Sequence, residues 1–463
     1  MRTPKTLPIP ALAALLALGS ACSGFSRVQA DASPDVPTLD SAPDLGRGLE
    51  ADLGGIPNDF PCGKDYWANA IKSDPNCNPR RVVLIDEGLP QGEYDEELWT
   101  VFGLSLALSE GKLGVAFDNR YSAEEGHLRL LSFPAGTTEK VPVSSVELIS
   151  GLPYHHYGYA VDLITAKKGG YHLAYAEVGA FGGQLGVRRW SGHGKPEPFE
   201  LVSTEVDRHA KVRLVEADDD QLHAIVYEDK AKRLLWSRRA PGGAWSTPSY
   251  LLKMSTTVTG AGQLAAHRHA GGHPAFVLHY GSGLGSQPLF KRWDPTSGWS
   301  GKTTLDNNTL DGLAGYSPAL VITPRENHAA YFTAGVSDTK AELWVASWSG
   351  LGAVTHQRVL EKILHDARSP QYALAMDVDQ WGLLHLVVAV PSIQAPSGTI
   401  EYWRQQLVAG KETWIYDVIE SDVISDSISR THVAIVVEPQ GKPHIVYYNG
   451  KHMRLMYATR DDR

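Results

Sequence analysis

The stretch that decides the fold runs from residue 441 to residue 460 and reads GKPHIVYYNGKHMRLMYATR. A glycine turn leads into an apolar strand with His444 near its start, and an Asn-Gly loop leads into a second strand from Leu455 to Thr459. Short runs of aromatic and β-branched residues separated by turn residues are typical of a β-hairpin. The stretch therefore predicts two antiparallel strands with one conspicuous histidine.

Copies of this hairpin recur from about residue 80 to the C-terminus, and they are the strongest signal in the chain. The residue that leads into the first strand is a histidine in five copies, and a glycine or a proline in two: Gly114, His172, His223, Pro274, His328, His385 and His444. The second strand begins with an aliphatic residue in every copy, at Leu128, Leu185, Leu234, Leu289, Leu343, Ile400 and Leu455. These starts are separated by 57, 49, 55, 54, 57 and 55 residues.

Each copy holds more than a hairpin. An alternating apolar strand precedes it, as at 104–107 and 433–437, and a fourth strand follows it, as at 146–149 and 250–252. Four short antiparallel strands at a period near 55 residues describe the blade of a propeller, and no helical period of useful length is visible. We therefore predict an all-β fold, a seven-bladed β-propeller over residues 80–463.

The sequence also predicts how the ring closes. After Leu455 the chain ends too soon for a fourth strand in the last blade. Near residue 80, Val82 to Ile85 precedes a Gly-Leu-Pro triplet, as the fourth strand of the first blade does. We expect this early segment to pair with the C-terminal hairpin, because that pairing removes two open sheet edges.

The N-terminus reads as a targeting segment. Residues 1–22 combine a basic start, a short apolar run and small residues before Cys22, and resemble a bacterial lipoprotein signal in which Cys22 is lipidated. Cleavage by an ordinary signal peptidase, before Cys22 or after Ala30, is the alternative. Both readings export the chain, either as a membrane-anchored lipoprotein of the cell envelope or as a secreted or periplasmic protein.

The segment after the signal differs from the repeats in composition. Residues 23–60 are rich in Pro and Asp and nearly free of aromatic residues, so we expect a solvated tether. In residues 61–79, Cys62 and Cys77 form an even pair in an oxidising location, which predicts a disulfide. A metal pair or a reactive thiol is the less favoured reading, because two cysteines do not complete a tetrahedral site.

Composition narrows the classes of function. The chain has 463 residues, 43% of them hydrophobic, and a formal net charge of −9. That balance supports a large core, and without a basic tract it argues against a nucleic-acid partner. We expect a monomer with no cofactor, attached to a membrane through a lipid anchor only.

The hairpin pattern, together with the Gly-x-Trp loop at 243–245, resembles the repeats of sialidase-like and lectin-like propellers in exported bacterial proteins. The resemblance covers residues 80–463. It implies an architecture and says little about activity, because such folds serve as hydrolases, lyases, sugar-binding modules and scaffolds. The Asp box that sialidases repeat, Ser-x-Asp-x-Gly-x-Thr-Trp, is not intact here, which weakens the case for an enzyme.

Several conspicuous side chains have a structural and a functional reading. We expect the repeated histidines to be fold elements whose rings hydrogen-bond neighbouring backbone. Packing between blades is favoured over sugar stacking for Trp245, Trp299 and Trp414. A metal site is the less favoured reading of the histidines at 267, 269 and 273. Solvated turns are favoured over calcium loops for the acidic runs at 218–220 and 377–379.

The better candidates for function lie where each fourth strand returns to the innermost strand of the next blade, because these returns crowd around the centre of a propeller. Aromatic rings, guanidinium groups and histidines there suit a polar or acidic sugar. The ligand-binding candidates are His155, His156, Tyr157, Arg208, His209, Tyr316, Arg368, Tyr372 and Arg430.

Three of these candidates also allow a sharper reading. The arginines at 208, 368 and 430 stand at comparable positions in their repeats, so they could form a carboxylate clamp similar to that of sialidases, with pairing to nearby aspartates as the alternative. Hydrolysis would further need a tyrosine nucleophile beside Glu96 or Glu97. We therefore expect a non-catalytic binding module for a glycan or another surface partner. A glycan-cleaving hydrolase and an envelope scaffold are the alternatives.

Overall fold

The computed structural model describes residues 80–85, 103–120, 126–137, 147–149, 156–179, 182–207, 210–228, 231–253, 264–268, 272–280, 286–305, 312–335, 340–350, 352–363, 373–391, 398–408, 411–421, 423, 432–449 and 454–460. They all belong to the second of two compact units, Met1–Asn58 and Asp59–Arg463. Within these residues the secondary structure is entirely β, as predicted.

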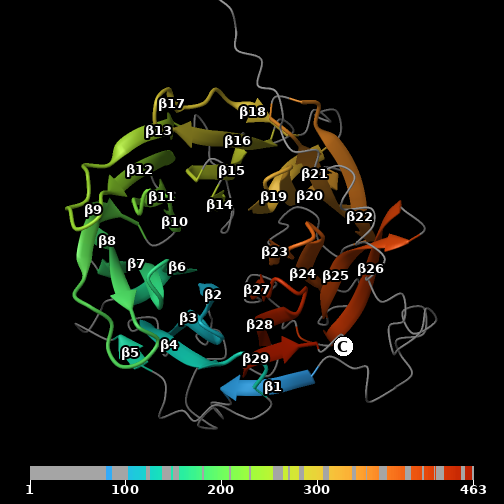
Figure 1. Cartoon of the computed structure of the whole chain (residues 1–463), viewed down its shortest axis with the longest axis horizontal. Coiled ribbons are helices and arrows are strands. Elements are labelled where there is room, and N and C mark those ends of the chain that lie inside the picture. Colours follow the sequence, from blue (N-terminus) through green and yellow to red (C-terminus); the bar gives the residue numbers. More distant parts are fainter. Residues whose placement is uncertain are drawn as a thin grey trace, which may run out of the picture. The chain divides into compact units, whose positions relative to one another are not determined.

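The strands form seven four-stranded antiparallel blades (Figure 1). Blade 1 contains β2 (Leu104–Ser109), β3 (Lys112–Arg120), β4 (Gly126–Pro134) and β5 (Glu147–Ile149). Blade 2 contains β6 (His156–Thr165), β7 (Tyr171–Gly179), β8 (Gly182–Trp190) and β9 (Glu200–Val206). Blade 3 contains β10 (Lys211–Glu216), β11 (Leu222–Glu228), β12 (Arg233–Arg239) and β13 (Ser249–Lys253).

The remaining blades follow the same order. Blade 4 contains β14 (Leu264–Arg268), β15 (Pro274–Tyr280) and β16 (Gln287–Asp294), and two short pieces, β17 (Gly298–Trp299) and β18 (Thr303–Thr304), form its outer strand. Blade 5 contains β19 (Gly312–Ile322), β20 (Asn327–Gly335), β21 (Lys340–Trp348) and β22 (Thr355–Ile363). Blade 6 contains β23 (Leu374–Val378), β24 (Leu384–Pro391), β25 (Gly398–Val408) and β26 (Lys411–Ser421). Blade 7 contains β27 (Val433–Val437), β28 (Pro443–Asn449), β29 (Arg454–Thr459) and β1 (Arg80–Ile85).

The apolar core is divided among the spaces between blades. Seven clusters of buried residues each combine side chains from two neighbouring blades, and together they link blade 1 to blade 2 and so on around to blade 7 and blade 1. Side chains alternate between the two faces of a strand. Along β28, Ile445 and Tyr447 therefore pack in the core shared with blade 6, and Val446 and Tyr448 in the core shared with blade 1. The ring of blades is closed.

The closure follows the sequence prediction. Strand β1 pairs antiparallel with β29, with Val82 opposite Tyr457 and Val83 opposite Met456, although the two segments lie more than 360 residues apart. Figure 1 shows β1 as the outermost strand of the blade that holds the C-terminal hairpin. The predicted signal, tether and cysteine pair, with Cys22, Cys62 and Cys77, lie outside the described residues.

Removal of β1 should open the ring. A chain that starts at Asp86 would lose the backbone pairing to β29, and net backbone hydrogen bonds contribute about 1 kcal/mol each, so we expect a loss of about 2–5 kcal/mol in unfolding free energy. The measurement is thermal unfolding by calorimetry, together with light scattering, because the bared strand edge should promote aggregation. A chain that starts at residue 61 retains β1 and is the control. Identical unfolding curves for the two chains would contradict the closure.

Candidate functional site

The strand order gives the ring two distinct faces. The innermost strand of every blade runs in the same direction, because the four antiparallel strands of a blade return the chain to the side where that blade began. We call the side where these strands begin the mouth face, and the side where they turn into the second strand the turn face. Figure 1 shows the innermost strands β2, β6, β10, β14, β19, β23 and β27 around the centre of the ring.

Three of the sequence candidates lie in strands at the mouth face. His156 and Tyr157 lie in β6 and Tyr316 lies in β19, where the structure describes the backbone. The other ligand-binding candidates lie outside the described residues, as do Glu96 and Glu97: His155, Arg208, His209, Arg368, Tyr372 and Arg430. The arginine clamp and the nine-residue binding site therefore stay predictions.

Two innermost strands differ from the others. Strand β6 has 10 residues and β19 has 11, whereas β2 and β10 have 6 and β14, β23 and β27 have 5. The additional residues lie at the start of each strand, on the mouth face. The register of β6 shifts between Tyr157 and Val161, and that of β19 shifts on both sides of Tyr316. Such bulges bend a strand and re-aim its side chains, and they are over-represented next to active sites.

The irregular starts of β6 and β19 are held in place by backbone features. His156 forms a parallel bridge with Gly126 at the start of β4, which ties the start of blade 2 to blade 1. Ser317 has a φ of 48°, in the left-handed region, and the residue is 9% exposed. A buried non-glycine residue in that conformation is sustained only where its surroundings require it, and such residues cluster at functional sites.

The repeated histidines are fold elements, as predicted, but most of their bonds go to side chains. His172, His223, His328, His385 and His444 are all buried. In blade 7, the Nδ1 atom of His444 lies 2.7 Å from the hydroxyl of Tyr457, with the two rings stacked. Blade 6 repeats this geometry: the Nδ1 atom of His385 lies 2.6 Å from the hydroxyl of Tyr402, and the two rings are stacked. The expectation of backbone partners was wrong for these two rings. On the adjacent strand, the residue two positions from the one opposite each histidine is a tyrosine on the same face of the sheet.

Carboxylates on the innermost strands connect one blade to the next. The Oδ2 atom of Asp162 in β6 accepts the backbone N–H of Leu214 in β10, at 2.7 Å. In the same way, Asp377 in β23 accepts the N–H of Val437 in β27, at 2.7 Å. An innermost strand has no further strand beside it, so its N–H groups on that edge need such partners. Sequence reasoning missed Asp162, a lone acid in an apolar strand. It grouped Asp377 with Asp379 in a solvated turn, whereas Asp377 lies in β23 and accepts an N–H group of the next blade.

Burial affects both of these carboxyl groups. It raises the pKa of Asp162, opposed by the charge of Arg213 and by the hydrogen bonds from Leu214 and Ser105. Burial also raises the pKa of Asp377, to about 6, and the N–H groups of Val437 and Val378 oppose the increase. Raised carboxyl pKa values occur at functional sites and also in structural networks. Here the observed partners are structural.

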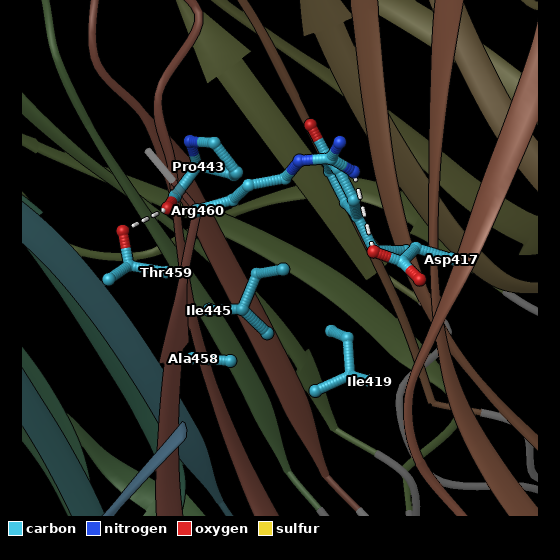
Figure 2. A pocket seen from close by; sticks show the side chains of 8 residues that line it. Asp417, Ile419, Pro443, Ile445, Ala458, Thr459 and Arg460 are labelled. Carbon is cyan, nitrogen blue, oxygen red and sulfur yellow. Dashed lines mark hydrogen bonds and ion pairs between the residues drawn. The ribbon is translucent and has the colours of Figure 1, made fainter. Parts of the chain in front are cut away.

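A small pocket lies between blades 6 and 7 (Figure 2). It has room for about one water-sized molecule and is too small for a sugar ring. At one side, Arg460 Nη1 lies 3.3 Å from Asp417 Oδ2, and both side chains are buried. Figure 2 shows this pair above Ile419, Ile445 and Ala458. The pocket is a packing feature in which a buried ion pair joins the end of β29 to the outer strand of blade 6.

The three outer tryptophans pack between blades, as favoured by the sequence. Trp245 packs against the core of blades 2 and 3 and donates its indole N–H to Glu200, at 3.2 Å. Trp299 packs against the core of blades 3 and 4, and Trp414 against that of blades 5 and 6. Their partly buried rings are therefore used in packing rather than presented as sugar platforms.

The histidine group of blade 4 is spread over two elements. His267 lies in β14, where its Nδ1 atom is 2.9 Å from the carbonyl of Arg268, and His273 lies in the turn before β15. His269 lies outside the described residues. No group of three His, Cys, Asp or Glu side chains among the described residues is placed to hold a metal ion.

The acidic turns make ordinary turn contacts. Asp218 lies 2.9 Å from Arg268 of blade 4 and 3.6 Å from Lys167 of blade 2, so this turn joins three blades on the turn face. Asp379 accepts the N–H groups of Trp381 and Leu383 within its own turn. The run at 218–220 is thus an exposed turn with ion pairs, as favoured by the sequence. The expectation of a solvated turn was wrong for 377–379, because Asp377 lies in β23 and Asp379 is buried. In addition, no helix in the described part of the chain is long and apolar enough to cross a membrane.

Comparisons with known proteins bear on the fold. No protein-family model matches the chain, and no curated protein matches it. Among solved structures, polysaccharide lyase Uly1 has a TM-score of 0.50 at 8% identity, covering 84% of this chain and 98% of that one. A Penicillium chrysogenum α-L-arabinanase has a TM-score of 0.45 at 10% identity, with 83% and 98% covered. The Hadza microbial sialidase Hz136 has a TM-score of 0.40 at 12% identity, with 75% and 76% covered. At such identities the likeness to the lyase concerns the β-propeller fold alone.

The raised pKa of Asp377 predicts a pH dependence of stability. Between the ordinary aspartate value of 3.8 and about 6, the folded chain holds a proton that the unfolded chain has released, so stability falls as pH rises through this window. Asp377→Asn cannot titrate there. We expect the stability of the wild type relative to this variant to fall by up to about 3 kcal/mol from pH 4 to pH 7. Thermal unfolding of both chains across that range is the measurement, and parallel curves would contradict the assignment.

Proposed function

We propose that the chain is a binding module without catalysis of its own, and that its ligand is a glycan or another surface partner held at the mouth face. The observation that carries this proposal is the extension of β6 and β19 at that face, where the register shifts at Tyr157 and on both sides of Tyr316. Blades 2 and 5 lie on different sides of the ring centre (Figure 1). Aromatic residues at such positions suit the flat, partly apolar face of a sugar.

The described carboxylates favour binding over hydrolysis. A glycosidase of the common type needs two carboxyl groups directed at the scissile bond. Asp162 and Asp377, the two acids with raised pKa on innermost strands, accept N–H groups of the next blade instead. A glycan-cleaving hydrolase would have to draw its carboxylates from elsewhere on the mouth face. It is the alternative function, and an envelope scaffold without a small ligand is the other.

The export of the chain is part of the proposal. The apolar run before Cys22 supports targeting to the cell envelope, with Cys22 as the site of lipidation. The Pro- and Asp-rich segment 23–60 would then hold the ring away from the membrane surface. A ligand at the cell surface fits that location.

Binding at the mouth face can be tested with a glycan array, followed by titration of any glycan that binds. We expect Tyr316→Ala and Tyr157→Ala each to weaken binding by about three- to tenfold, the contribution of one aromatic contact. Tyr250→Ala is the matched control, because Tyr250 lies on the outer strand of blade 3 and is 66% exposed. Equal losses in all three variants would contradict a mouth-face site. Turnover of labelled sialosides or other glycosides would favour the hydrolase, and neither binding nor turnover would favour the scaffold.

The N-terminus of the mature protein tests the export proposal separately. Mass spectrometry of protein from a bacterial host should find the chain starting at Cys22 with two or three acyl chains. Cys22→Ala should release the protein from the membrane fraction without a change in its unfolding temperature, because the ring begins near residue 80. An unmodified N-terminus at Asp31 would instead show cleavage by an ordinary signal peptidase.

A further inference from the structure

The second nitrogen of the repeated histidines usually meets an acid from the chain itself. In blades 2, 5, 6 and 7 the Nε2 atom faces a carboxylate oxygen, in the pairs His172 and Glu216 (3.6 Å), His328 and Glu326 (3.9 Å), His385 and Asp379 (3.4 Å), and His444 and Glu438 (2.7 Å). Four of the five repeated histidines therefore have an internal acid partner. Blade 3 is the exception.

The histidine of blade 3 carries an unused donor. Trp236 donates its indole N–H to Nδ1 of His223 at 3.1 Å, so a neutral ring must carry its proton on Nε2. His223 is 0% exposed, and its Nε2 atom has no hydrogen-bond partner among the described residues. Burial, opposed by the charge of Asp219 and aided by the charges of Arg238 and His273, lowers the pKa of His223 to about 4, so the ring is neutral at pH 7. An N–H group buried without an acceptor is unfavourable.

The missing acid can be traced to one residue. Asp379 and Glu438 each follow the innermost strand by one residue, and each donates its backbone N–H to the carbonyl four residues on, at 3.2 and 2.9 Å. Ala217 occupies the same turn position in blade 3, with its N–H 2.8 Å from the carbonyl of Gln221. Alanine has no carboxylate to offer. The backbone that places the acid is thus shared by blades 3, 6 and 7, while the acid at this turn position is absent from blade 3. Asp219 in the same turn accepts hydrogen bonds from Gln221 instead.

A cation and several aromatic rings surround the unused donor. Arg238 lies directly opposite His223 in the strand register and is exposed. Its guanidinium carbon lies 5.6 Å from the ring centroid of Trp236 and 5.8 Å from that of Trp293. The rings of His223 and His273 pack on Trp293 at 5.3 and 5.2 Å. We call these five residues the blade 3–4 cluster.

The guanidinium of Arg238 differs in its hydrogen bonding from that of the equivalent arginine in blade 2. No hydrogen bond or ion pair joins it to another residue in the described part of the chain. Arg189, which holds the same register position opposite His172 in blade 2, donates to the carbonyls of Lys168 and Gly169. The blade 3–4 cluster therefore combines two unused sets of donors, one neutral and one cationic, on the turn face.

We propose that the blade 3–4 cluster binds the carboxylate of an external ligand, which takes the place that Asp379 and Glu438 fill in their own blades. The Nε2–H group of His223 and the guanidinium of Arg238 would donate to the carboxylate oxygens, a charge-assisted arrangement that is stronger than neutral hydrogen bonds. The partly exposed ring of Trp236 would contact the body of the ligand, with Arg238 moving aside to admit it, while the buried ring of Trp293 supports His223. A uronic acid or another small carboxylic acid fits this chemistry. The site lies on the face opposite the mouth and does not depend on the function proposed there.

The test is a titration of the full chain with sodium glucuronate, with neutral glucose as the control ligand. Tryptophan fluorescence and calorimetry report binding, because the indole ring of Trp236 would contact the ligand and that of Trp293 packs beside it. We expect glucuronate to bind and glucose not to bind. Ala217→Asp should weaken the affinity for glucuronate at least about tenfold, since it supplies the internal acid that blade 6 has. Arg238→Gln should have an effect of similar size.

Two variants in blade 2 are matched controls. Ala166→Asp changes the equivalent turn residue, where His172 already faces Glu216, and Arg189→Gln changes the equivalent arginine. Both should bind glucuronate as the wild type does. Calorimetric unfolding verifies that each variant is folded, and Arg238→Gln carries the test if Ala217→Asp does not fold. Absence of glucuronate binding to the wild type, or equal binding by Ala217→Asp, Arg238→Gln and the wild type, would overturn the proposal.

Discussion

Burial of both faces of every blade is the constraint on which the whole ring depends. Along a strand such as β28, successive side chains enter two different cores, one shared with each neighbouring blade. A single blade therefore cannot bury its own apolar surface, and a row of blades would leave two faces bare. Closure by β1 solves this problem and also covers the outer edge of the C-terminal hairpin. This is why the fold requires segments at both ends of the propeller domain.

The inner edge of the ring creates a second demand, which polar side chains meet. An innermost strand has a partner on one side only, and the space between blades is too apolar for free N–H groups. Asp162 and Asp377 each provide an acceptor to the next blade, and Ser105 accepts the N–H of Leu163 in the same way at 2.9 Å. Because an acid in this position is largely buried, its charge is disfavoured, and the pKa rises. Backbone pairing around the ring centre and the pH dependence of stability thus have one cause.

Much of the fold could be predicted from sequence because it repeats. The register of blade 7, the seven hairpins and the pairing of β1 follow from alternation, turn residues and the spacing of leucines. The partners of Asp162 and Asp377 could not be assigned, because an acidic residue in an apolar strand does not indicate which neighbouring strand it will contact. The partners of the histidines were also missed, since Tyr402 and Tyr457 reach them across the sheet rather than along the chain. At the mouth face, the length of β6 and β19 was hidden by bulges that break the two-residue alternation.

Because the blades repeat, a position at which one blade differs from the others can be recognised. When the same backbone turn recurs in blades 3, 6 and 7, the change from Asp379 or Glu438 to Ala217 cannot be attributed to a different local fold. The histidine in blade 3 remains, and an aromatic side chain still fixes its ring, yet the acceptor that the other copies supply is gone. The fold therefore still orients the Nε2–H group of His223, but it no longer supplies an acceptor. That donor is available to an external ligand. The same reasoning applies to β6 and β19, whose departures from a five- or six-residue strand both lie on the mouth face. In a structure built from copies, function is best sought where one copy departs from the rest, in a single side chain as in blade 3 or in a local bulge as in β6 and β19.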